Sequence, residues 1–327
     1  MKRNETRLLR ALLALALAAA LLPLNACRSS DSPLRVSLIL KTTVNTAEFW
    51  SQVMDGVNTA ADELGVKLTV SAASAETAVD EQIGLMRDAI AAKPDAILLV
   101  ASDRDRLVPA VEDAAAAGIP VVTMDSDVDT PSRAGFVASD NLRIGRSLGE
   151  MLGQFLPDGG KVAILTPSLI SSSGMDRVEG VRGVIDAAGK YDLLGVYNCE
   201  NDLETARSLV DSILAEHPDA DAFVCANEVC NIGAALTLTQ AGLDGKVTVI
   251  GCDNSWRQIQ YLERDAIQGI VIQRPFNIGY VAVEEAVKAA RGETVPLFTE
   301  IGCVKITRDN MYNSDNQKLL FPFKSSN

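Results

Sequence analysis

Short, almost unbroken apolar runs alternate along this chain with longer segments in which apolar residues recur at helical spacing. The runs of the first half are residues 36–40, 66–70, 96–100, 121–124 and 134–138. The rhythm restarts in the second half with residues 162–165, 193–196, 222–225, 247–250 and 269–272. Strands are continuously apolar when helices cover both faces of a parallel sheet. The two rounds therefore predict an α/β fold of two doubly wound, Rossmann-like lobes built on parallel sheets.

The segments between these runs carry helix signals. Phe49, Val53 and Val57 follow one another at four-residue spacing, which predicts an amphipathic helix after the first run. Gly65 then ends that helix as a C-terminal cap would. About 300 residues follow the N-terminal segment, which is enough for two domains of ordinary size, each with its own core.

The first 27 residues have the order of an export signal. A basic start leads into the apolar run 11–22, which is too short for a membrane span, and small residues precede Cys27. The end of this segment resembles a bacterial lipobox, which implies cleavage before Cys27 and a lipid on its thiol. The alternative is a plain secretion signal with an incidental cysteine. Residues 28–33 would form a short polar tether between this anchor and the folded body. In both cases the mature chain lies outside the cytoplasm.

Charge excludes some partners. The formal net charge is −13 at pH 7. A nucleic-acid partner would require a basic surface, so we expect none. The same charge disfavours binding to anionic lipid headgroups, so we expect membrane attachment through Cys27 only.

The five cysteines after Cys27 predict neither a metal site nor a disulfide framework. They are Cys199, Cys225, Cys230, Cys252 and Cys303. An odd number of cysteines scattered through apolar strands is typical of buried thiols, although one disulfide stays open in an exported protein. The spacing of Cys225 and Cys230 does not match a zinc site, and no histidine lies nearby. We therefore expect no metal and no cofactor.

Polar and aromatic residues gather just after the predicted strands, where open parallel sheets bind their ligands. The candidates are Lys41, Phe49, Trp50, Asp125, Ser126, Arg177, Asn201, Asn227, Asp253 and Gln273. Carboxylates accept hydrogen bonds from hydroxyls, amides donate and accept, and arginine offers a planar fork of donors. An aromatic face can cover the C–H face of a sugar ring. The set suits a neutral polyhydroxylated ligand, although Asp125 and Asn227 also fit as helix caps and the aromatic pair fits in a core.

A series of short motifs runs through the chain in a fixed order. The pieces are Phe49-Trp50 with Asp55-Gly56, residues 118–122 leading to Asp125, Ser139-Asp140-Asn141 with Gly145, Arg177 with Gly180, residues 217–219 leading to 226–228, residues 249–253, and Gln273 with Pro275 and Ile278-Gly279. In this order and spacing, residues 34–310 resemble the periplasmic sugar-binding proteins of ABC transporters, of the ribose- and galactose-binding type. The sensor domains of lactose-repressor-type regulators share that fold.

The resemblance implies roles for the candidate residues. Phe49 and Trp50 become the aromatic residues that stack on the ligand. The hydroxyl-binding set becomes Asp125, Arg177, Asn227, Asp253 and Gln273. Asn201 stands where ribose binders place another aromatic residue, and Ser126 stands where many of these proteins have a ligand-binding arginine. Lys41 would supply a replacement positive charge.

The resemblance also implies that the chain crosses three times between the lobes, near Ser139, Gln273 and Gly302. The first lobe would comprise residues 34–138 and 274–302, and the second residues 139–273 and 303–320. A ligand that both lobes hold favours the closed arrangement of the hinge. An ABC transporter permease or another membrane receptor would then recognise the closed form.

Other functional classes fit less well. An enzyme is not expected, because His217 is the sole histidine, and the chain has no nucleophile elbow, phosphate-binding loop or dinucleotide-binding turn. A sensory role is the alternative: a ligand-sensing subunit would present its closed form to a chemoreceptor or a sensor kinase. The sequence does not separate the two partners. It leaves the ligand as a sugar or polyol.

Overall fold

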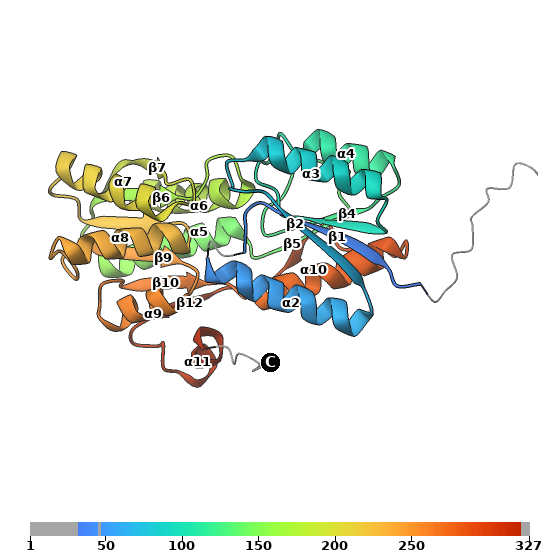
Figure 1. The fold of residues 1–327 in the computed structure, drawn as a ribbon. Coiled ribbons are helices and arrows are strands. Elements are labelled where there is room, and N and C mark those ends of the chain that lie inside the picture. The colour runs from blue at the N-terminus through green and yellow to red at the C-terminus, as the bar shows by residue number, and fades with distance from the viewer. Residues whose placement is uncertain (1–31, 45–46, 322–327) are drawn as a thin grey trace, which may run out of the picture. The chain divides into compact units, whose positions relative to one another are not determined.

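The computed structural model describes residues 32–44 and 47–321 (Figure 1). The folded body is the unit that begins at Leu34. The predicted export signal, its Cys27 and residues 28–31 of the predicted tether lie outside the described residues. Within the described residues, every helix is too short or too polar to cross a bilayer.

The folded body contains two six-stranded sheets. The first has the order β11-β5-β4-β3-β1-β2, and its strands pair in parallel. Its strands are β1 (Arg35–Leu40), β2 (Lys67–Ala72), β3 (Ala96–Leu99), β4 (Val121–Met124), β5 (Gly135–Ala138) and β11 (Thr299–Glu300). Its helices are α2 (Glu48–Leu64), α3 (Val79–Ala92), α4 (Val108–Ala116) and α10 (Pro275–Ala290).

Side chains of β1 show why this strand is continuously apolar. Leu38 and Leu40 pack with residues of α2 and α10, whereas Ile39 packs with residues of α3 and α4. Successive side chains of a strand point to opposite faces, so both faces of this sheet are buried under helices. This covering of both faces is what the apolar runs predict.

The second sheet has the order β12-β10-β9-β8-β6-β7. Its strands are β6 (Gly160–Thr166), β7 (Tyr191–Asn198), β8 (Ala222–Cys225), β9 (Thr248–Cys252), β10 (Gly269–Ile272) and β12 (Val304–Thr307). Its helices are α5 (Asn141–Phe155), α6 (Ser172–Ala188), α7 (Leu203–Glu216), α8 (Glu228–Gln240), α9 (Trp256–Glu263) and α11 (Ser314–Leu320). Residues of α5 and α6 pack on one face, and those of α7, α8 and α9 on the other. The predicted two-lobe α/β fold is confirmed, with one difference: β12 pairs antiparallel to β10.

The chain passes between the two sheets at three places (Figure 1). The strand β5 lies in the first sheet, and α5, which follows it, packs on the second. The strand β10 lies in the second sheet, and α10 returns to pack on the first. Residues 301–303 then connect β11 of the first sheet with β12 of the second. Each lobe is therefore built from separate stretches of the chain.

Two glycines allow α5 and α6 to pack closely. A Cβ atom on Gly145 would lie 2.1 Å from the carbonyl oxygen of Arg177, and one on Gly180 would lie 2.3 Å from that of Leu142. Any larger residue would force the two helices apart, because backbone atoms cannot yield as a flexible side chain can. The close packing brings Arg177 on α6 against Asn141 at the start of α5.

Candidate ligand-binding site

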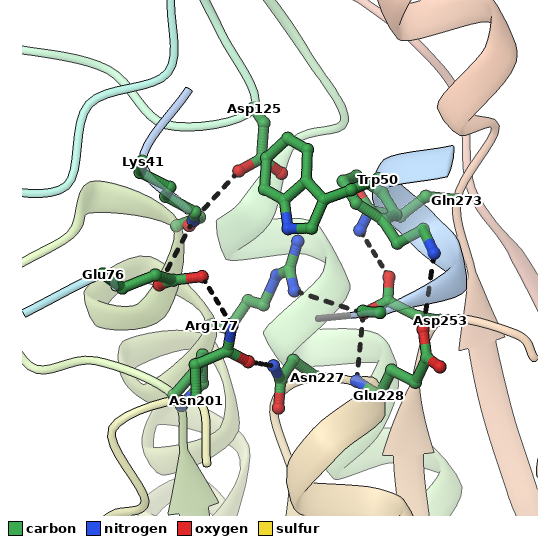
Figure 2. Close-up of a pocket in the computed structure, with 14 residues that line it drawn as sticks. Lys41, Trp50, Glu76, Asp125, Arg177, Asn201, Asn227, Glu228, Asp253 and Gln273 are labelled. Atoms are coloured by element: carbon green, nitrogen blue, oxygen red, sulfur yellow. Dashed lines mark hydrogen bonds and ion pairs between the residues drawn. The ribbon is translucent and has the colours of Figure 1, made fainter. Parts of the chain in front are cut away.

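Side chains that follow the strands of both sheets line one pocket (Figure 2). Of the residues predicted from the sequence, those that line it are Lys41, Phe49, Trp50, Asp125, Arg177, Asn201, Asn227, Asp253 and Gln273. Ser126 is fully buried one layer behind. Its Oγ lies 3.3 Å from Lys41 Nζ and 2.6 Å from Ser173 Oγ, so it supports pocket residues rather than lining the cavity.

The pocket also contains residues outside the predicted set: Ala47, Glu76, Pro167, Ser173 and Glu228. Glu76 lies in the connection that follows β2, so the same strand-end rule could have found it. Glu228 directly follows the predicted site residue Asn227 in the sequence, so the same rule could have found it as well. The remaining lining residues are uncharged and carry no sequence signal of a site.

The first lobe contributes a buried ionic cluster, which we call the Lys41 cluster: Lys41, Glu76 and Asp125. Lys41 Nζ lies 3.2 Å from Asp125 Oδ2 and 3.6 Å from Glu76 Oε2. Burial opposes the charge of Lys41, but the two carboxylates outweigh it and raise the lysine pKa. Burial also raises the pKa of Glu76, which Lys41 offsets only in part. Glu76 Oε2 accepts no hydrogen bond from the described residues, so one buried acceptor stays available.

The first lobe also contributes two aromatic rings to the wall of the pocket. Phe49 and Trp50 are buried on the first turn of α2, and their rings meet edge to face with centroids 5.0 Å apart. Lys41 Nζ lies 5.6 Å from the centroid of the Trp50 ring. Both rings belong to the core of the first lobe and line the pocket. The core and ligand-contact interpretations of this pair are therefore compatible.

The second lobe holds Arg177 by hydrogen bonds. Its Nε donates to Asn141 Oδ1 and its Nη1 to the carbonyl oxygen of Ala226, each at 2.8 Å. Its Nη1 also lies 4.0 Å from Asp253 Oδ2. Burial opposes the guanidinium charge, yet the acidic groups around it, Asp253 and Asp125 among them, raise its pKa. The side chain is fixed and permanently charged, with donors left over for a ligand.

Asp253 is also held in place by its neighbours. Gln273 Nε2 donates to its Oδ1 at 2.7 Å, and the backbone N–H of Glu228 donates to its Oδ2 at 3.2 Å. Because Gln273 directly follows β10 and Glu228 begins α8, the carboxylate is fixed from two sides. We call Arg177, Asp253 and Gln273 the Arg177 cluster.

A chain of amides connects the two halves. Asn227 Oδ1 accepts from the backbone N–H of Cys230 and so caps α8. Its Nδ2 donates to Asn201 Oδ1 at 2.8 Å, and Asn201 Nδ2 donates to Glu76 Oε1 at 3.0 Å. Asn227 is thus both a helix cap and a pocket residue, and Asn201 links the lobes across the pocket (Figure 2).

Three pocket residues have left-handed backbone conformations. The φ angles are 62° at Asp125, 72° at Asp253 and 55° at Asn201. This region is uncommon for residues other than glycine, although Asp and Asn enter it most readily. Such strain persists where the surrounding structure enforces it, and it concentrates at functional sites. Asp125 and Asp253 occupy matching positions, each directly after a strand of its own sheet.

Carboxylates of each lobe reach helix N-termini of the other. Glu228 accepts from the backbone N–H groups of Glu48 and Phe49 at 3.3 and 3.4 Å, where α2 has no side-chain cap of its own. Glu48 Oε2 in turn accepts from the N–H of Trp256 at the start of α9, at 3.3 Å. Burial raises the pKa of Glu228 to about 7, with Asp253 adding to the effect. These contacts hold the lobes together.

The cavity enclosed by these residues is small. Its volume is about 30 Å³, which is room for about two water molecules. A monosaccharide is much larger than that. A ligand as large as a monosaccharide therefore enters only when the lobes or the lining side chains move apart.

Comparison with known proteins gives one consistent result. Residues 36–294 match the family described as periplasmic binding protein domain. A D-ribose/D-allose-binding protein of Pseudomonas aeruginosa is 28% identical over 304 residues, which covers 90% of this chain and 94% of that protein. These matches favour a transport component over the sensory alternative.

Two solved structures give the same result for the fold. One is an ABC transporter solute-binding protein from Agrobacterium vitis with bound D-fucose, with a TM-score of 0.84 and 30% identity over 88% of this chain and 100% of that one. The other is a carbohydrate transporter solute-binding protein from Agrobacterium radiobacter in complex with D-arabinose, with a TM-score of 0.84 and 25% identity over 89% and 100% of the two chains. The likeness covers nearly all of the folded body.

Proposed function

Since this chain belongs to the periplasmic binding protein family, we propose that it is the extracytoplasmic solute-binding component of an ABC transporter and that it captures a sugar or polyol between its two lobes. The observation that carries this proposal is the meeting of carboxylates, amides, a guanidinium and an aromatic face in one pocket. Each of these groups has a matching partner on a polyhydroxylated ring. The names of its relatives include D-ribose, D-allose, D-arabinose and D-fucose, which supports a monosaccharide.

Charge supports a neutral ligand. Four carboxylates line the pocket, from Glu76, Asp125, Glu228 and Asp253, against the two cations Lys41 and Arg177. An anionic ligand would meet more repulsion than attraction in a buried site, where charges are weakly screened. We assign ligand contact to the predicted residues that line the pocket, with Glu76 added. Ser126 supports Lys41 from behind.

The two halves of the site support a closing mechanism. We assign the hinge to the three crossings, with residues 34–138 and 274–302 in one lobe and 139–273 and 303–320 in the other. The ligand gains contacts to both lobes only when they close, so binding shifts the hinge equilibrium toward the closed form. The permease then receives the ligand from that form.

The N-terminal segment adds an attachment. We infer that cleavage before Cys27 leaves a lipidated cysteine, which holds the protein at the membrane while residues 28–33 act as a tether. Mass spectrometry of the exported protein tests this inference, because the lipid adds a large, defined mass to the N-terminal peptide. A Cys27→Ser variant is the control. An exported chain with an unmodified Cys27 would reduce the segment to a secretion signal.

Thermal unfolding with a ligand panel tests the function. The panel contains D-ribose, D-allose, D-arabinose, D-fucose, xylitol, myo-inositol and unrelated metabolites such as amino acids. A ligand at 100 times its Kd stabilises the folded protein by about 2.7 kcal/mol, which raises Tm measurably. We expect a shift with one or a few of the sugars or polyols. A shift with only an unrelated metabolite would overturn the ligand class.

A further inference from the structure

Two cysteines lie together close to the pocket. Cys199 directly follows β7, and Cys230 lies in the first turn of α8. Their sulfur atoms are 2.7 Å apart, and both residues are fully buried. Two thiols that are not bonded do not rest at so short a separation, whereas a bonded pair lies about 2.05 Å apart. A small movement would therefore bring the sulfurs to bonding distance.

The other cysteines do not share this arrangement. Cys225 and Cys252 are buried, and Cys303 is partly buried. Cys199 and Cys230 form the one pair of sulfur atoms in contact among residues 32–44 and 47–321. Burial raises the pKa of the Cys225 and Cys230 thiols, which makes them poor nucleophiles in the folded protein. Cys230 is therefore not a reactive thiol.

The sulfur pair lies at the base of two segments that line the pocket. Cys199 precedes Glu200 and Asn201, which both have φ angles of 55°, in the left-handed region. Asn201 accepts a hydrogen bond from Asn227, and Asn227 accepts one from the N–H of Cys230. A bond between the sulfurs would thus close a ring through the two asparagines and hold the strained turn in place.

We propose that Cys199 and Cys230 form a structural disulfide in the exported protein. The proposal goes beyond the binding function and depends only on the extracytoplasmic location, where disulfides form and persist. The bond would link β7 to α8 within the second lobe and fix the positions of Asn201 and Asn227.

The chemistry is a thiol–disulfide exchange. Each cysteine loses the hydrogen on its Sγ, and one Sγ–Sγ bond forms. The two electrons and two protons pass to the disulfide of an extracytoplasmic oxidoreductase, which becomes a dithiol. Because both sulfurs are buried after folding, the exchange takes place while the chain folds. The finished bond is then shielded from reductants.

Peptide mapping of the full chain, purified after export, tests the proposal directly. The protein is denatured without reductant, its free thiols are alkylated, and it is digested with trypsin and a glutamate-specific protease. Cleavage after Glu228 separates Cys225 from Cys230, which one tryptic peptide would otherwise carry together. We expect residues 191–200 linked to residues 229–246. Alkylated Cys199 and Cys230, or a bond that includes Cys225, would overturn the proposal.

Unfolding under reducing conditions gives an independent reading. A disulfide closing a loop of about 30 residues restricts the unfolded chain, so reductant should lower Tm by about 5 °C or more. Cys199→Ser and Cys230→Ser should lower Tm and abolish the response to reductant. Cys225→Ser, a buried cysteine of the same core, should keep the response. If the wild-type protein has the same Tm with and without reductant when it is heated until fully unfolded, this would count against the bond. Sugar binding is scored separately by the ligand panel.

Discussion

The two halves of the pocket both pair a buried cation with buried acids, but they hold it differently. In the Arg177 cluster, Asn141 and the Ala226 carbonyl fix the guanidinium, and Gln273 and a backbone N–H fix Asp253. In the Lys41 cluster, charge pairing at 3.2 and 3.6 Å provides most of the contact, and one oxygen of Glu76 accepts no hydrogen bond.

This difference separates a rigid half from an adaptable one. Hydrogen bonds with fixed geometry position the donors of the second lobe before a ligand arrives, which lowers the cost of ordering them on binding. A lysine is a point charge on a flexible stem, so the Lys41 cluster can rearrange around different hydroxyl patterns. We infer that the Arg177 cluster provides affinity and the Lys41 cluster provides selectivity among sugars.

Removing one acid from each half is expected to have the largest effect. The double variant Asp125→Ala with Asp253→Ala should abolish sugar binding, because each half loses its principal acceptor, Arg177 loses its acidic partner and Lys41 keeps only Glu76. Calorimetry with the sugar found in the thermal screen measures this, and circular dichroism checks the fold. Retained affinity would mean that the ligand binds elsewhere.

Arg177→Lys is expected to have the next largest effect. It keeps the charge but loses the planar fork, so Asn141 and the Ala226 carbonyl lose their donors. We expect affinity to fall about 100-fold, as for the loss of two hydrogen bonds to a charged group. A loss smaller than that of Lys41→Ala would reverse the assignment of the rigid half.

Lys41→Ala should weaken binding less, by about tenfold, the value of one charge-assisted hydrogen bond. Its effect should also differ between sugars if this half sets selectivity. Combining it with Glu76→Gln, which neutralises one of the two carboxylates left without a cation, should recover part of the loss. Unchanged affinity in Lys41→Ala would show that this lysine does not take the place of the arginine that many of these proteins have at the position of Ser126.

The smallest effect concerns the contact of Glu228 with α2. Its pKa is about 7 with the lobes in contact, above the ordinary value of 4.5. A carboxyl group whose pKa rises on closure holds its proton more tightly in the closed form, so closure is favoured below the ordinary pKa and loses this contribution as pH rises through about 7. Because Asp253 lies in the same lobe and raises the pKa of Glu228 in the open form as well, only part of the shift depends on closure, and sugar affinity should strengthen a few-fold from pH 8 to pH 5.5. Glu228→Gln should flatten this dependence, and an unchanged pH profile in that variant would exclude the group.

Much of the molecule follows from local sequence patterns. The apolar runs fix the strands because both faces of each sheet are covered, as Leu38 and Ile39 on opposite faces of β1 illustrate. The carboxyl ends of parallel strands meet at one edge of a sheet, so the positions of Asp125 and Asp253 in the pocket were predictable. The antiparallel pairing of β12 was not predictable, because it depends on the direction in which the chain re-enters the sheet.

Contacts between distant segments were decided by tertiary structure alone. No local pattern places Glu228 at the start of α2, 179 residues away in sequence from Phe49, or leaves Ser126 behind Lys41. The meeting of Cys199 and Cys230 likewise depends on how β7 and α8 pack. Periodicity and turn residues encode what one element buries and where it ends. Which side chains meet, and how far their pKa values shift, is set only when the elements pack together and exclude water.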